Sequence, residues 1–230
     1  EHVPAGAAEL DCRGRAVLPA LVDSHTHLVW GGDRKNELEM RLAGADYEAI
    51  FAAGGGILSS VRKTRELTDD ELFAQSLARL QRMLRSGTTA VEIKSGYGLD
   101  LGTELRQLRV ARRLAEETGV RVKTTCLAAH ALPAELRDRP EGRAAYVARV
   151  CDEILPAVQS AGLADFCDVF CDRGAFTPEE TREILRAAQA LGLPIRLHAN
   201  EFGHTGGALL AAEFAAHRLP DLRIGVGQRP

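Results

Sequence analysis

The sequence predicts an α/β fold, namely a TIM-like (β/α)8 barrel of which about five of the eight βα units lie within this chain. Two observations lead to this prediction. Short apolar runs rich in β-branched residues alternate with longer amphipathic segments along the chain. In addition, polar residues follow every such run, which is where a barrel gathers its functional groups.

The expected strands are the apolar runs at residues 16–22, 88–93, 120–127, 166–170 and 194–197. Each run is separated from the next by a stretch with helical periodicity. A strand, a helix and a second strand in this order form a βαβ unit, whose two strands are parallel. The sequence therefore predicts one parallel sheet.

The helix signals are strongest in two of the intervening segments. Residues 68–87 open with a capping box formed by Thr68 and Glu71 and end at a glycine. Residues 177–192 repeat this pattern, with Pro178 at the first helical position. Further helices are expected at residues 103–117, 142–159 and 206–216.

The residues that follow the strands decide between the two common parallel architectures. The five runs lead into D-S-H-T-H, E-I-K-S-G-Y-G, L-A-A-H-A, F-C-D and L-H-A-N-E. A doubly wound sheet concentrates its ligand groups at one switch point, whereas a barrel brings the ends of all its strands into one ring. Polar groups at all five ends favour the barrel.

Composition narrows the classes of function. The chain has 230 residues, of which 45% are hydrophobic and 27% charged, and its formal net charge is −3. These values are typical of a globular protein and leave no basic field that would capture nucleic acid. Five cysteines without a C-x-x-C pair predict a cytoplasmic protein. Because no apolar run reaches about 20 residues, we expect no membrane partner, and because of the charge we expect no nucleic-acid partner.

Two histidines follow the first apolar run. His25 and His27 are two residues apart, so in an extended segment they project to the same side and can share one bound ion. His198 ends the fifth strand, with Glu201 three residues later. The H-x-H pair alone is about equally consistent with structural histidines. Three histidines on one ring, with a carboxylate beside them, favour a metal that keeps a position open for water.

Other motifs have structural explanations. The glycines of G-G-G-I and S-G-Y-G lack the spacing of phosphate-binding loops, and conformational need explains them better. Cys167 and Cys171 are four residues apart on one short strand, where buried free thiols are commoner than a chelate. His130, at the end of the third strand, is either a hydrogen-bonded core residue or a substrate contact, and its position favours the contact.

Longer stretches resemble one protein family. They are L-V-D-S-H-T-H-L-V-W-G-G-D-R, E-I-K-S-G-Y-G-L-D, A-A-H-A-L-P, D-V-F-C-D and H-A-N-E-F, within residues 17–212. In this order they are similar to the imidazolonepropionase family of the amidohydrolase superfamily, a group of metal-dependent hydrolases. The resemblance implies hydrolysis of the cyclic amide of 4-imidazolone-5-propanoate to N-formimidoyl-L-glutamate in histidine degradation. It also implies bound Zn2+ or Fe, allows a homodimer, and assigns the metal to His25, His27 and His198.

The resemblance implies roles for five further residues. Glu201 would accept the proton of the attacking water and return it to the ring nitrogen. His130 would donate to the carbonyl oxygen as negative charge develops there. Arg34 would bind the carboxylate of the propanoate with its planar fork of donors. Tyr97 and Tyr47 would hydrogen-bond the substrate ring.

The chain departs from the family at several positions. Asn200 stands where the family commonly has an acidic residue, and no counterpart of the family's aspartate ligand or further histidine follows Ala212. We therefore expect an incomplete chain, truncated or frame-shifted, with little activity of its own. The expected domains are a remnant of a small β-rich domain at residues 1–15, a partial barrel at 16–214 and a divergent tail at 215–230.

Two other functions remain open at this point. One is another cyclic amidohydrolase or an aminohydrolase (deaminase), which an assay for ammonia release would separate from ring opening. The other is an inactive metal-binding fragment.

Overall fold

The computed structural model describes residues 6–8, 10–45 and 55–215. Five parallel strands form one sheet in the order of the chain, and they are β1 (Leu21–Thr26), β2 (Thr88–Lys94), β3 (Arg121–Ala129), β4 (Phe166–Cys171) and β5 (Ile195–Ala199). Parallel strands that are adjacent in the order of the chain, with helices between them, are arranged as in a barrel wall. The sheet is a curled half-barrel, and this confirms the predicted fold class.

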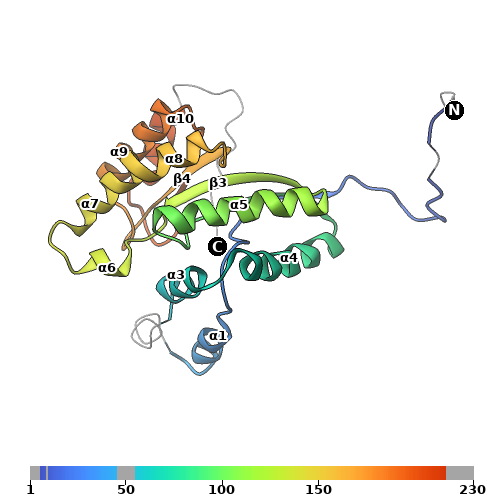
Figure 1. The fold of residues 1–230 in the computed structure, drawn as a ribbon, viewed down its shortest axis with the longest axis horizontal. Coiled ribbons are helices and arrows are strands. Elements are labelled where there is room, and N and C mark those ends of the chain that lie inside the picture. The colour runs from blue at the N-terminus through green and yellow to red at the C-terminus, as the bar shows by residue number, and fades with distance from the viewer. Residues whose placement is uncertain (1–5, 9, 46–54, 216–230) are drawn as a thin grey trace.

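Helices connect the strands and cover the outer face of the sheet (Figure 1). They are α1 (Lys35–Leu42), α3 (Ile57–Glu66), α4 (Asp69–Arg85), α5 (Leu101–Thr118), α6 (Ala134–Arg137), α7 (Gly142–Arg149), α8 (Leu155–Ser160), α9 (Pro178–Ala190) and α10 (Gly207–Ala215). α4 packs on β2, α5 on β3, α9 on β4 and α10 on β5. Within the described part of the chain, none of these helices has the length and apolarity needed to cross a bilayer.

The first strand differs from its prediction. β1 begins only at Leu21 and continues through the first histidine to Thr26, whereas residues 16–22 were expected to be the strand. Val17 and Leu18 are 76% and 80% exposed, not buried. Among the described strands β1 pairs only with β2 and lies at the edge of the sheet, so little of the chain packs over the residues that lead into it.

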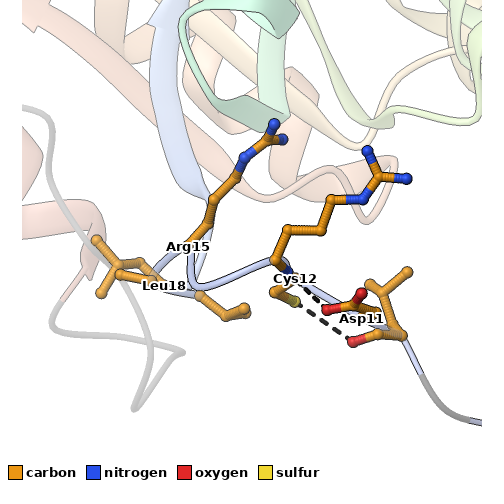
Figure 2. Close-up of a pocket in the computed structure, with 8 residues that line it drawn as sticks. Asp11, Cys12, Arg15 and Leu18 are labelled. Atoms are coloured by element: carbon orange, nitrogen blue, oxygen red, sulfur yellow. Dashed lines mark hydrogen bonds between the residues drawn. The ribbon is translucent and has the colours of Figure 1, made fainter.

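Before β1 the chain forms an extended arm that leads away from the sheet (Figure 1). Figure 2 shows residues 10–18 of this arm, where the Asp11 carboxylate accepts the Arg13 N–H at 2.8 Å and the Cys12 thiol donates to the Leu10 carbonyl at 3.5 Å. These residues line an open hollow of about 550 Å³, and none of the predicted site residues contributes to its lining.

One predicted helix is interrupted. Residues 142–159 were expected to form a single helix, but α7 and α8 are joined by a π-helical turn at Val150–Ile154. Pro156, in the first turn of α8, has no N–H to donate to a carbonyl in the preceding turn, and its ring crowds that turn. The backbone widens there instead of breaking, as in other single-turn π-bulges.

The sequence did not predict α1, α3 or α6. α1 reads K-N-E-L-E-M-R-L and has no continuous apolar face, and α6 is a single turn of four residues. α3 directly follows the glycine run, and Gly56 precedes it with φ +80°, a conformation that glycine adopts without strain. Gly56 therefore serves the backbone turn, in agreement with the conformational explanation of this motif.

The core lies between the sheet and its helices in two clusters. One contains residues of β3, β4 and β5 with those of α5, α7, α8 and α9, and it includes the fully buried Leu155 and Ile184. The other joins β2 to α4 and α5 through residues such as Leu72 and Leu114. Each such side chain contributes roughly 1.5–3 kcal/mol through burial. Tyr146, also fully buried, donates its hydroxyl to the Ala128 carbonyl at 2.8 Å.

The capping box of α4 allows a test of helix initiation. The Glu71 N–H donates to the Thr68 hydroxyl at 3.3 Å, and the Thr68 N–H donates to the Glu71 carboxylate at 2.9 Å. We expect Thr68→Ala to lower the free energy of unfolding by about 1 kcal/mol, because the Glu71 N–H loses its acceptor. Urea unfolding measures the effect, and Thr68→Ser, which keeps the oxygen, should remain near wild type. Equal losses in the two variants would contradict this account.

Candidate metal centre

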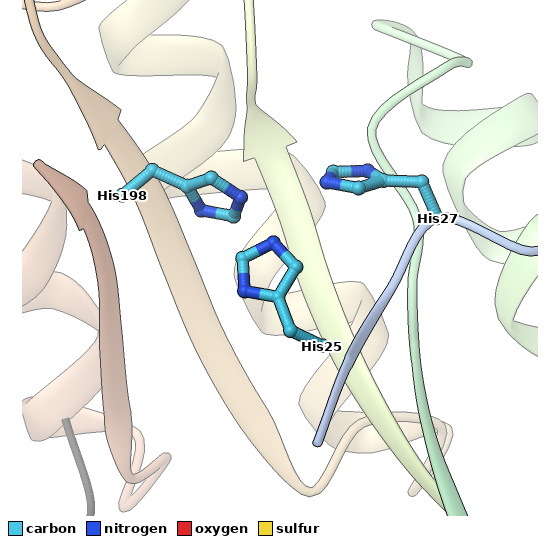
Figure 3. Close-up of side chains that lie close together, drawn as sticks. All are labelled: His25, His27 and His198. Atoms are coloured by element: carbon cyan, nitrogen blue, oxygen red, sulfur yellow. The ribbon is translucent and has the colours of Figure 1, made fainter. Parts of the chain in front are cut away.

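Three imidazoles from the first and last described strands meet on the inner side of the sheet. His25 lies in β1, His27 follows that strand, and His198 lies in β5. One nitrogen of each ring lies within 4.8 Å of the other two, and the ring centroids of His25 and His198 are 4.5 Å apart. Figure 3 shows the three rings turned toward a common space. The structure thus brings together the three predicted ligands.

The surroundings of these rings suit a cation. Burial lowers the pKa of His25 to about 4 and that of His27 well below 6.5, so both rings are neutral at pH 7. Neutral imidazole is the form that binds a metal. Nδ1 of His27 and Nε2 of His198 are buried without a hydrogen-bond partner, which costs free energy. A metal ion bound by these nitrogens would remove that cost.

Asp168, Lys94 and Glu92 form a buried ionic group next to His198. Asp168 Oδ1 accepts the His198 backbone N–H at 3.1 Å, and Oδ2 lies 3.0 Å from His198 Nδ1. Lys94, only 1% exposed, donates to Asp168 at 2.9 Å and to Glu92 at 2.7 Å. Burial alone would raise the pKa of Asp168, but His198 and Lys94 hold it well below its usual range. An ionised Asp168 therefore helps to orient His198.

His130 and Tyr97 lie against the three histidines. The His130 ring stacks on His27 with centroids 4.9 Å apart, and the Tyr97 ring is 5.2 Å from His130. Burial raises the pKa of Tyr97, so its hydroxyl keeps its proton. Burial lowers the pKa of His130 to about 4, so this ring is neutral at pH 7.

The tautomer of His130 differs from the one that the predicted role requires. Its Nδ1 lies 2.9 Å from the Gly96 carbonyl oxygen, which can only accept, so Nδ1 carries the proton. In the neutral ring Nε2 is then an acceptor. The expectation that His130 donates to a substrate carbonyl requires the other tautomer or a charged ring.

Arg34 lies just before α1, beside a buried carboxylate. Its Nε donates to Glu37 at 2.8 Å, and its Nη2 contacts the same oxygen. The other Glu37 oxygen accepts the Gly56 N–H at 2.8 Å. Burial raises the pKa of Tyr97, but the positive charge of Arg34 opposes this rise, which places Arg34 near the aromatic side of the site.

Glu201 lies in the exposed loop after β5. Asp172, buried at the end of β4, accepts the backbone N–H groups of Glu201 at 2.6 Å and Phe202 at 3.0 Å. Asn200 has φ +60°, a left-handed conformation that asparagine tolerates better than most residues. Glu201 is therefore held by its backbone directly after the strand that carries a predicted ligand. Tyr47, predicted to bind the substrate ring, lies outside the described residues.

The five cysteines are free thiols, and Cys126, Cys167 and Cys171 are buried. Burial raises the pKa of Cys167 well above its usual range, so this thiol stays protonated. These observations agree with the structural interpretation of the cysteines.

A family model described as the amidohydrolase family matches residues 16–219. The chain belongs to this family. Two relatives are similar over most of the chain, and both are named imidazolonepropionase. The protein from Polaromonas sp. (strain JS666 / ATCC BAA-500) is 55% identical over 217 residues, which are 93% of this chain and 50% of the relative. The protein from Paracidovorax citrulli (strain AAC00-1) is 56% identical over 203 residues, which are 88% of this chain and 48% of the relative.

This amidohydrolase chain thus spans about half the length of the curated relatives it matches. Among solved structures, an adenine deaminase from Arthrobacter aurescens is similar with a TM-score of 0.50 and 19% identity, over 85% of this chain and 61% of that one. At this identity the similarity supports the fold alone.

Sequence reasoning missed the groups that hold the predicted residues. Arg79 of α4 donates to the carbonyls of Trp30 at 2.7 Å and Gly32 at 3.0 Å, and so shapes the chain between His27 and the predicted carboxylate-binding arginine. In the sequence, Arg79 resembles any solvated helix charge. Lys94 did leave a signal, because alternation in V-E-I-K puts two opposite charges on one face of a strand.

Proposed function

We propose that this chain provides three histidine ligands of the metal and part of the substrate site of an imidazolonepropionase, which hydrolyses 4-imidazolone-5-propanoate to N-formimidoyl-L-glutamate. The observation that carries the proposal is the cluster of His25, His27 and His198 in a chain 55% identical to a protein of that name. The ion would be Zn2+ or Fe, because both accept neutral imidazole ligands.

The residues around the cluster support ring opening. A metal ion held by the three imidazoles would make hydroxide available near neutral pH and polarise the amide carbonyl. Glu201, held by its backbone directly after β5, would take a proton from water and pass it to the leaving ring nitrogen. The acceptor Nε2 of His130 would bind a ring N–H, and the protonated Tyr97 would donate to the substrate. Arg34, whose positive charge acts on Tyr97, would bind the propanoate carboxylate.

We further propose a cytoplasmic location and no nucleic-acid partner. Five free thiols support a cytoplasmic, reducing environment, and a net charge of −3 does not favour nucleic acid. We also propose a homodimer, which light scattering of the purified chain would test.

The deciding experiment compares two proteins: this chain, and this chain extended by the C-terminal half of the Polaromonas relative. Substrate loss, N-formimidoyl-L-glutamate and ammonia are measured for both. We expect ring-opened product from the extended protein and little or none from the chain alone. Ammonia without ring-opened product would instead support an aminohydrolase. Bound metal without turnover in either protein would support an inactive metal-binding fragment.

Arg34→Ala in the extended protein tests the carboxylate contact. We expect KM to rise by about thirtyfold, equivalent to roughly 2 kcal/mol, at the low end for a broken charge pair because the side chain is 36% exposed. Arg41→Ala, which removes an exposed arginine at the other end of α1, is the control and should leave KM unchanged. An unchanged KM in Arg34→Ala would assign Arg34 to the Glu37 ion pair alone.

A further inference from the structure

Glu104 is a fully buried carboxylate in the first turn of α5, and the proposed reaction does not use it. Its Oε2 accepts the Gly96 N–H at 3.0 Å. Its Oε1 accepts the N–H groups of Gly98 at 2.9 Å and Leu99 at 2.8 Å. One side chain therefore satisfies three backbone donors of the short loop at residues 95–99, which follows β2.

The conformation of this loop needs an external constraint. Gly96 has φ +105° and Leu99 has φ +56°. The left-handed region costs an ordinary residue roughly 1–2 kcal/mol, so Leu99 stays there only if other contacts hold it. The backbone is also tightly packed, because a Cβ at Gly96 would lie 2.7 Å from the Leu127 carbonyl oxygen. The Glu104 carboxylate supplies hydrogen bonds on both sides of the turn.

The loop at residues 95–99 contains Tyr97 and contacts His130. The Gly96 carbonyl oxygen accepts the proton of His130 Nδ1 at 2.9 Å. The Tyr97 N–H donates to Gln107 at 3.1 Å, and Gln107 in turn donates to the Val29 carbonyl at 2.6 Å. The Glu104 carboxylate accepts a hydrogen bond from the Gly96 N–H. The Gly96 carbonyl in turn determines which nitrogen of His130 carries the proton.

We propose that Glu104 is a positioning residue that fixes the tautomer of His130 by holding the 95–99 loop, so that Nε2 of this ring is left as an acceptor. The geometry thereby favours a substrate ring that presents an N–H at this point. This consequence for substrate choice rests on the proposed function. The tautomer itself is a property of the chain and is measured without turnover.

Glu104→Gln is the informative change because it preserves shape. Both carboxylate oxygens accept backbone N–H groups, so an amide must turn its NH2 group toward at least one donor. If its oxygen keeps Gly98 and Leu99, the NH2 group opposes the Gly96 N–H and displaces that peptide. The matched control is Asp165→Asn. Asp165 also accepts a backbone N–H, that of Thr124 at 2.9 Å, but it precedes β4 at the opposite end of the sheet.

The experiment records 15N spectra of histidine-labelled, metal-free chain, with His130→Gln used to assign the signals. We expect well-separated ring nitrogen shifts for His130 in wild type and in Asp165→Asn, because one tautomer is populated. In Glu104→Gln the two shifts should move together as the second tautomer appears. Amide exchange at Gly96 should also accelerate about tenfold, as expected for the loss of one buried hydrogen bond.

Unchanged His130 shifts in a folded Glu104→Gln chain would overturn the proposal. If this variant does not fold, the wild-type protein decides. An Nε2–H tautomer of His130, or rapid exchange of the Gly96 amide, would overturn the proposal, whereas an Nδ1–H tautomer with slow exchange would support it. None of these signals depends on whether imidazolonepropanoate is a substrate, so failure of the proposed function would be seen separately.

Discussion

Lys94→Met is expected to lower the free energy of unfolding by about 3–5 kcal/mol, the usual effect of removing one partner from a buried ion pair. Lys94 is 1% exposed and lies between Glu92, 3% exposed, and Asp168, 2% exposed. Methionine fills a similar volume, so the loss of packing is small. The main effect is electrostatic, because two neighbouring buried carboxylates remain without the cation that lies between them.

Lys123→Met is the matched control. Lys123 also pairs with an aspartate, Asp165, at 2.8 Å, but its side chain is 65% exposed. An exposed pair of this kind contributes about 0–1 kcal/mol. Urea unfolding of both variants measures the difference, and Asp168→Asn added to Lys94→Met should restore part of the lost stability. Equal losses in the two lysine variants would contradict a structural role for the buried group.

His198→Ala should weaken metal binding strongly, because it removes a ligand. The loss of a residue that only hydrogen-bonds a ligand typically weakens binding by about 10–100-fold, and we expect a larger effect here. His198 is the most buried of the three histidines, and Asp168 contacts both its backbone and its ring. Titration with Zn2+, followed by calorimetry and by metal content after dialysis, measures the loss.

His204→Ala is the control for this experiment. His204 is an exposed histidine in the loop after β5, and it is not part of the cluster. Its removal should leave both affinity and stoichiometry at wild-type values. Stoichiometric, tight zinc in His198→Ala would show that the ion binds elsewhere.

The sequence was informative where a local pattern has one physical meaning. The capping boxes at Thr68 and Thr177 begin helices in the structure, and the histidines at the carboxyl ends of β1 and β5 meet. Such features depend on neighbours within a few residues or on the parallel topology. The start of β1 was predicted wrongly, because an apolar run does not show whether another element covers it.

Groups that act over long separations were harder to predict. Glu104 and Gln107 lie on the buried side of an amphipathic helix, where the sequence pattern shows only that they are polar. Their function depends on the loop at residues 95–99, whose backbone donors point toward them. The tautomer of His130 was missed for the same reason, since a backbone carbonyl sets it.

The three histidines lie far apart along the chain, and this separation constrains the order of events during synthesis. His25 and His27 leave the ribosome before His198, which follows only after the intervening strands have been made, and chains fold broadly from the N-terminus. A nascent chain has only two of the three ligands until β5 has paired with β4. Bringing His198 next to His25 and His27 closes a long loop, which costs conformational entropy. The pairing of the strands must offset this cost before the ion can bind tightly. We therefore expect tight metal uptake to be a late step in maturation, which would report that the sheet from β1 to β5 has assembled.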